Sequence, residues 1–182
     1  GKSYTAILTG ELKEEMTVNQ PLGDDLASPV YVKTTVREDG SEAISHFTPL
    51  AVSQGFTLAK VVTETGRKHQ IRAHAHWMGH LMVGDKIYGP DERLYLEFID
   101  HGWSEAMAEK LLLPRQALHC AEIDLSGAWV DKVFKAPLTE DLAAFARNHG
   151  SPREPRVSAR GLAFPWGVRK VFPVCSPEKC DD

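Results

Sequence analysis

The 182-residue sequence lacks long apolar runs, a cysteine framework and an excess of positive charge. No stretch approaches the roughly 20 apolar residues that a membrane-spanning helix needs, and the polar start of the chain is unlike a signal peptide. The three cysteines, Cys120, Cys175 and Cys180, show no repeated C-x-x-C spacing. This pattern argues against a disulfide framework and a structural zinc site. We therefore expect reduced thiols in a cytoplasmic protein without a membrane partner.

The charge balance argues against binding of nucleic acid by bulk attraction. The formal net charge is −4, and residues 1–150 carry 15 Lys and Arg against 21 Asp and Glu. Residues 60–90 are a local exception, with five Lys and Arg against two Asp and Glu. In residues 151–182, arginines and aromatic residues recur between prolines. Such a tail can stack on bases, although packing on the domain or disorder is the more common explanation of this composition.

Apolar periodicity predicts an α+β domain over residues 1–150 and a Pro/Arg/aromatic C-terminal tail over residues 151–182. Strands joined by short turns predict a mixed, mostly antiparallel sheet, and helices are inserted at intervals to flank it. Gly79 and Ser104 are expected to cap helices at their C-terminal and N-terminal ends, respectively. The expected strands are 4–10, 30–36, 43–50, 56–65, 117–123 and 132–136, and the expected helices are 69–78, 91–99, 104–112 and 140–148.

The stretch from Thr65 to His80 concentrates polar and basic chemistry. A strand is expected to end at Gly66 and a helix to begin within a few residues. That junction offers free backbone N–H groups and the positive end of a helix dipole. Arg67, Lys68 and His69 lie at the junction, and Arg72 shares a helix face with His69. The arrangement predicts a cationic site for a phosphate or a carboxylate.

Histidines in the same stretch raise a metal-site alternative. His76 and His80 have the i, i+4 spacing of metal ligands. However, Gly79 is expected to end the helix between them, and no third ligand is recognisable. Hydrogen-bonded or RNA-contacting histidines are therefore favoured, and a metal-dependent hydrolase that uses His69, His76 and His80 is the least favoured function.

Several motifs, in order along residues 2–145, resemble those of the RluA-type RNA pseudouridine synthases. The family signature G-R-[TS]-H-Q-[IL]-R-V-H is matched from Gly66 to His74, with Lys68 and Ala73 as mild departures. Its G-H-P-[IV]-V-G-D-x-x-Y-G motif is matched from Gly79 to Gly89, with Leu81-Met82 in place of Pro-Ile. Shorter matches are Lys2–Ala6 to K-x-Y-x-A, Leu118–Cys120 to L-H-A and Ala136–Leu138 to A-P-L.

The resemblance implies a catalytic domain of the pseudouridine synthase fold and an enzyme that isomerises uridine in rRNA or tRNA without cofactor or metal. Tyr4 matches the tyrosine that stacks on the target base and is proposed to take its C5 proton. Arg72 matches the arginine that pairs with the catalytic aspartate. Candidate contacts to the RNA backbone or to the flipped uridine are Arg67, Lys68, His69 and His74.

The family's aspartate motif, H-R-L-D-x-x-T-S-G, does not occur in these 182 residues. The resemblance therefore implies a domain that is incomplete at its N-terminus, with the nucleophile upstream of Gly1. We expect this chain alone to be inactive, and we expect self-association or a retained N-terminal fragment to cover the exposed sheet. The main alternative is a non-catalytic RNA-binding relic of the same fold.

Overall fold

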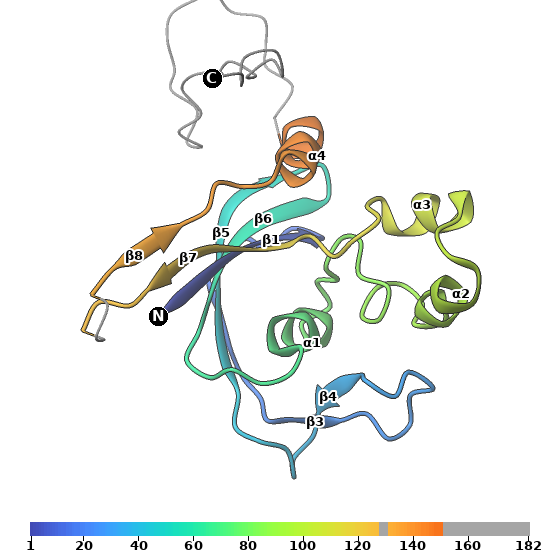
Figure 1. The fold of residues 1–182 in the computed structure, drawn as a ribbon, viewed down its shortest axis with the longest axis horizontal. Helices are drawn as coiled ribbons and strands as arrows, with labels where there is room; N and C mark the ends of the chain where they lie inside the picture. Colours follow the sequence, from blue (N-terminus) through green and yellow to red (C-terminus); the bar gives the residue numbers. More distant parts are fainter. Residues whose placement is uncertain (128–130, 151–182) are drawn as a thin grey trace, which may run out of the picture. The chain divides into compact units, whose positions relative to one another are not determined.

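The structure, a computed structural model, describes residues 1–127 and 131–150, and the expected tail at 151–182 lies outside this part. The described part is an α+β fold that contains a six-stranded sheet, a two-stranded sheet and four helices (Figure 1). All strand pairs are antiparallel, and the order in the large sheet is β2-β5-β6-β1-β7-β8. The strands are β1 (Lys2–Thr9), β2 (Met16–Asn19), β3 (Leu22–Asp24), β4 (Thr34–Val36), β5 (Ile44–Ser53), β6 (Phe56–Thr63), β7 (Leu118–Asp124) and β8 (Val133–Lys135). The helices are α1 (Gln70–Trp77), α2 (Arg93–His101), α3 (Glu105–Leu111) and α4 (Glu140–Gly150).

Alternation along β1 divides the core between the two faces of the large sheet. Ala6 and Leu8 are buried in a cluster with residues of α1, including Ile71 and Ala75. Ile7, which points to the opposite face, is buried against α4 residues of a second cluster. Figure 1 shows α1 and α4 on opposite sides of the sheet. The predicted α+β class with a mostly antiparallel sheet is confirmed.

The region between β1 and β5 departs from the prediction. The expected strand 30–36 is wrong in its first half, because only Thr34–Val36 forms a strand and Tyr31 is 94% exposed. Residues 25–33 form a turn instead, closed by the backbone hydrogen bond from Asp25 N to Lys33 O at 3.0 Å. The short strands β2 and β3 were not predicted, because each has only one buried side chain and therefore no readable alternation.

The helix ends follow the capping residues closely. Gly79, with φ +78°, follows Met78, the C-cap residue of α1. The Ser104 hydroxyl accepts a 3.3 Å hydrogen bond from Met107 N at the start of α3. Before α2, Asp91 Oδ1 accepts from Arg93 N at 2.9 Å. No helix in residues 1–127 and 131–150 is long and apolar enough to cross a lipid bilayer.

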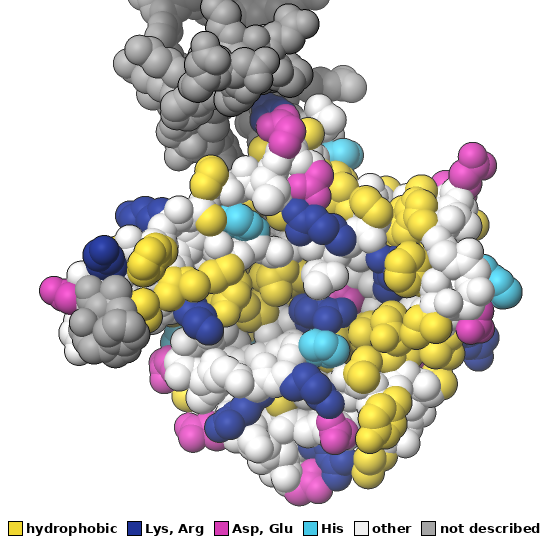
Figure 2. Space-filling model, viewed as in Figure 1, with side chains coloured by type: hydrophobic (Ala, Val, Ile, Leu, Met, Phe, Trp, Pro, Cys, Tyr) yellow, Lys and Arg dark blue, Asp and Glu magenta, His cyan; other side chains and the backbone are white. Residues whose placement is uncertain are grey.

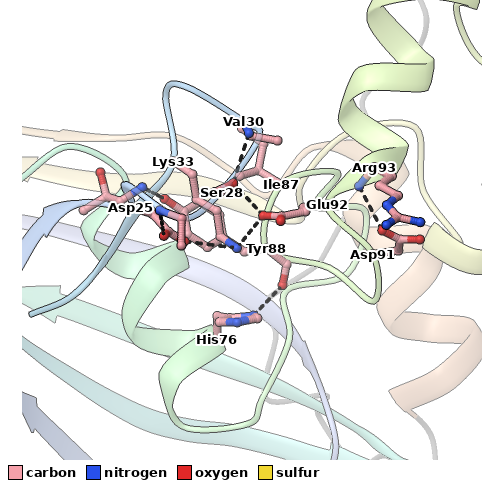
Figure 3. Close-up of polar contacts among 12 residues, drawn as sticks. Asp25, Ser28, Val30, Lys33, His76, Ile87, Tyr88, Asp91, Glu92 and Arg93 are labelled. Carbon is pink, nitrogen blue, oxygen red and sulfur yellow. Dashed lines mark hydrogen bonds and ion pairs between the residues drawn. The ribbon is translucent and has the colours of Figure 1, made fainter.

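The neighbouring Glu92 fixes the turn 25–33 against the start of α2. Its carboxylate accepts hydrogen bonds from Ser28 Oγ and Lys33 Nζ, both at 2.7 Å (Figure 3). Lys33 also lies 3.6 Å from the Asp25 carboxylate. These bonds hold the β3–β4 hairpin against the segment that follows the motif from Gly79 to Gly89.

Candidate active site

Gln70 holds the turn that leads from β6 into α1. Its side-chain oxygen accepts from Thr65 Oγ1 and from the Arg67 backbone N–H, both at 2.9 Å. Its amide nitrogen donates to the Ile44 carbonyl at 2.9 Å and to Ser45 Oγ at 3.0 Å. Gln70 therefore satisfies the turn and anchors it to β5, while remaining 4% exposed.

Arg72 forms a bidentate ion pair with Asp85. Its Nε lies 2.6 Å from Oδ2 and its Nη2 lies 2.7 Å from Oδ1. The Asp85 side chain has no exposed surface, and that of Arg72 is 12% exposed. The sequence predicted that this arginine meets a carboxylate from outside the chain, whereas the carboxylate it binds here is internal, 13 residues further along. Sequence reasoning missed Asp85 as a site residue. An acid with apolar residues on either side, at 81–83 and 87–88, is the signal that could have found it, because a buried charge needs a partner.

The loop that carries Asp85 is fixed by its backbone. Asp85 Oδ1 accepts 3.0 Å hydrogen bonds from the N–H groups of Ile87 and Tyr88. Gly84 has φ +75°, and a Cβ there would lie 1.9 Å from the Arg115 carbonyl oxygen. A Cβ on Gly89 would lie 2.2 Å from the Asp85 carbonyl oxygen. The two glycines therefore allow a close backbone approach that a side chain would prevent.

Tyr88 connects the parts of the site. Its hydroxyl accepts from the Thr34 N–H at 2.8 Å and lies 3.1 Å from His69 Nδ1. Its ring lies 5.0 Å from the Arg72 guanidinium, a cation–π arrangement. The carbonyl of Tyr88 accepts from His76 Nδ1 at 3.1 Å (Figure 3). His69, which precedes α1 with φ +55°, and Arg72 on α1 thus both contact Tyr88.

His74 lies in the interior with 0% exposure. Its Nε2 donates to the Gln20 carbonyl at 3.0 Å, and its Nδ1 lies 2.9 Å from Ser45 Oγ. With Gln70 donating to Ser45, the hydroxyl is free to donate to a neutral ring, which completes the chain of bonds. Burial lowers the pKa of His74, opposed by its bond to Gln20. The buried ring has no surface on which RNA could contact it, so we do not propose His74 as a substrate contact.

Arg67 and Lys68 are exposed at the start of α1. Arg67 Nε donates to the Glu42 carbonyl at 2.8 Å, and Lys68 Nζ lies 2.6 Å from Asp24 Oδ1. His69 is partly buried, and burial followed by the nearby Arg72 charge lowers its pKa, which favours the neutral ring. Figure 2 shows Lys, Arg and His side chains gathered over α1, next to apolar side chains over β1 and β7.

Tyr4 lies on β1 between Val61 and Cys120 of the neighbouring strands. It packs against the apolar cluster that contains Ile71, so it is on the sheet face that α1 covers. Burial, with a smaller effect of Cys120, raises the pKa of Tyr4, which keeps its hydroxyl protonated at neutral pH. Within the described part of the chain, no hydrogen bond or ring contact joins Tyr4 to Arg72.

The histidines of the metal-site alternative have separate partners. His69 and His76 contact the hydroxyl and the carbonyl of Tyr88, whereas His80 Nδ1 donates to the Thr9 carbonyl at 2.9 Å. Among residues 1–127 and 131–150, no three His, Cys, Asp or Glu side chains come together as metal ligands. The hydrolase alternative gains no support from this geometry.

Comparison with known proteins shows which family these motifs represent. The family described as RNA pseudouridylate synthase matches residues 1–77, which include Tyr4 and Arg72. An "uncharacterized RNA pseudouridine synthase YlyB" of Bacillus subtilis is 34% identical over 152 residues, or 81% of this chain. The chain belongs to the RNA pseudouridine synthase family. The resemblance inferred from the sequence is confirmed.

Other members of the pseudouridine synthase family agree in sequence and in fold. The "ribosomal large subunit pseudouridine synthase D" of Pseudomonas aeruginosa is 34% identical over 76% of this chain. The solved human "RNA pseudouridylate synthase domain containing 4" is 19% identical and covers 80% of this chain and 60% of its own, with a TM-score of 0.59. This pseudouridine synthase chain spans less than half of those bacterial relatives, 43% of the Bacillus subtilis protein and 42% of the Pseudomonas aeruginosa one.

Proposed function

We propose that this chain is part of an enzyme that isomerises uridine to pseudouridine in RNA, with its catalytic aspartate supplied by polypeptide upstream of Gly1. The reaction breaks the N-glycosidic bond and rejoins the base through carbon, with no cofactor and no metal. One observation carries the proposal: Tyr4 and Ile71, the neighbour of Arg72, meet in one cluster on the same face of the sheet. This packing brings the strand that carries Tyr4 against the helix that carries Arg72, and base stacking beside a carboxylate–arginine pair needs those two elements together.

The side chains divide the work by position. Tyr4 offers a flat, partly exposed ring for an extruded uracil, since the glycosidic carbon is inaccessible inside a base stack. Its raised pKa keeps the hydroxyl of Tyr4 protonated. Stacking on the base does not depend on that proton, whereas abstraction of a proton by Tyr4 requires the hydroxyl to lose its own proton first. Arg72 orients the carboxylate of the aspartate and keeps it ionised. Arg67, Lys68 and His69 contact the RNA backbone or the uridine.

The substrate is proposed to be ribosomal RNA first and transfer RNA second. Relatives in Nitrosomonas europaea and Pseudomonas aeruginosa carry the name ribosomal large subunit pseudouridine synthase D. Large-subunit RNA is therefore the first substrate to test. Modification of either RNA is consistent with a cytoplasmic location, and this location stays a prediction.

The experiment compares four proteins in single-turnover reactions on RNA from a strain that lacks the gene. The complete gene product is expected to form pseudouridine at a defined uridine, and residues 1–182 alone are expected to form none. Tyr4→Phe in the complete gene product is expected to bind RNA and lose turnover, while Tyr95→Phe is the control. Product from residues 1–182 alone would refute the upstream aspartate.

The alternative is a non-catalytic RNA-binding protein of the same fold. The observation that favours it is that Arg72 already holds an internal carboxylate, that of Asp85. Under this alternative, the complete gene product binds RNA in a gel-shift assay but converts no uridine. A product band at one mapped uridine rules it out.

The outer strands leave apolar surface that bears on partners. Val133 and Phe134 of β8 are 46% and 52% exposed. We propose that either the upstream polypeptide or a second copy of the chain covers this edge, because unpaired apolar strand edges favour association. Sedimentation of residues 1–182 as a concentration-independent monomer would contradict the second possibility.

A further inference from the structure

Asp85 is bonded far more completely than a turn residue needs to be. Its carboxylate accepts two hydrogen bonds from Arg72 and two from the backbone of Ile87 and Tyr88. It has no exposed surface, and its loop is fixed by the close approach at Gly84. A carboxylate held in this way cannot turn to follow its partner, so it dictates where the guanidinium lies.

The plane of the Arg72 guanidinium is fixed, but not all of its N–H groups have hydrogen-bond partners within the described part of the chain. Two of its nitrogens, Nε and Nη2, bind the two Asp85 oxygens, and the Tyr88 ring lies 5.0 Å from its centre. Within the part of the chain that the structure describes, Nη1 has no hydrogen-bond partner. Since the group is planar with five N–H donors, fixing two nitrogens also fixes the direction of the third.

We propose that Asp85 is a positioning residue, which orients Arg72 so that Nη1 receives the catalytic carboxylate without rearrangement. This inference rests on the proposed function, because it assumes that such a carboxylate binds Arg72. Asp85 also offsets the charge of Arg72 as seen from a distance, so the arginine adds little to the attraction of RNA and acts on the catalytic carboxylate at short range, through Nη1. Removal of the Asp85 charge should therefore separate binding from chemistry.

The test is Asp85→Asn in the complete gene product, assayed on the RNA that the wild type modifies. We expect kcat to fall about 10- to 100-fold, the effect of displacing a catalytic group by roughly 1 Å. KM is expected to stay equal or to fall, because the site gains one net positive charge. The matched control is Asp141→Asn. Asp141 accepts hydrogen bonds from Nε and Nη2 of Arg115 in the same bidentate manner, but its side chain is 40% exposed. This control is expected to leave kcat and KM unchanged.

Each outcome decides. An unchanged kcat, or a raised KM at unchanged kcat, overturns the positioning role. If Asp85→Asn does not fold, Asp85→Glu keeps the charge and shifts its place, and it is expected to lower kcat with KM unchanged. If neither variant folds, Asp85 serves the fold alone and the proposal is overturned. If the wild-type gene product forms no pseudouridine, the proposed function fails, and this inference fails with it.

Discussion

Tyr88→Phe removes one oxygen atom from the centre of the site. The ring can stay in place, so the contact with the Arg72 guanidinium is kept. What disappears is the acceptor for the Thr34 backbone N–H, 2.8 Å away, and the bond to His69 Nδ1 at 3.1 Å. Because Thr34 is 3% exposed and Tyr88 is 1% exposed, water has little access to replace the hydroxyl.

The loss can be sized from the buried donor. An unsatisfied buried N–H costs about 1–3 kcal/mol, which is more than the net gain from an ordinary hydrogen bond. For a chain of this length, each 1 kcal/mol lowers the melting temperature by roughly 2–4 °C, so we expect a fall of about 2–12 °C. Thr34 has little reserve, since its own hydroxyl oxygen is already buried without a partner in the described part of the chain.

Urea unfolding followed by circular dichroism measures the loss of free energy of unfolding, and a thermal scan measures the fall in melting temperature. Amide hydrogen exchange reports on Thr34 directly. The control is Tyr95→Phe, because the hydroxyl of Tyr95 has no hydrogen bond among the described residues. We expect the control to be as stable as the wild type. A Tyr88→Phe variant with unchanged stability and a still-protected Thr34 amide would refute the reasoning.

Two further predictions concern the backbone at Gly84 and the buried His74. Gly84→Ala should cost more than about 2 kcal/mol, because strain at φ +75° adds to a Cβ contact 1.9 Å from the Arg115 carbonyl oxygen. Gly55→Ala, with φ +79° and nothing within 4 Å of the Cβ, isolates the strain and should cost less in the same urea titration; equal costs would contradict the steric argument. Burial lowers the pKa of His74 below that of the unfolded chain, about 6.5, so stability is complete above this pH and falls as the pH falls through and below it. Urea midpoints between pH 7.5 and 5.5 measure this, and a midpoint that rises on acidification would contradict it.

Local signals in the sequence predicted much of the fold. Gly79 and Ser104 mark helix ends because their chemistry acts within a few residues: φ above zero for one and a side-chain acceptor for the other. Long alternating strands such as β6 are equally readable. The four-residue β2 and three-residue β3 were missed because pairing with distant partners, rather than their own pattern, makes them strands.

The sequence named candidate residues for the site but did not show the contacts among them. Motif matching identified Tyr4 and Arg72 within the stretch that the family match covers. It did not show that Asp85 would be the carboxylate held by Arg72, because that pairing depends on how the loop after α1 folds back. Nor did it show that His74 is buried, because a histidine looks alike in sequence whether Ser45 or a ligand binds it. The Pro/Arg/aromatic tail at 151–182 stays a prediction.

Two of the three cations around the start of α1 already face acids of the same chain: Lys68 faces Asp24, and Arg72 faces Asp85. A surface with its charges matched in this way holds few counterions that a passing polyanion could release. Non-specific binding of cellular RNA to this surface therefore gains little free energy from counterion release. Under the proposed function, discrimination then depends on whether the RNA can place a uracil ring on Tyr4, which selects for the shape of the RNA and not for its abundance.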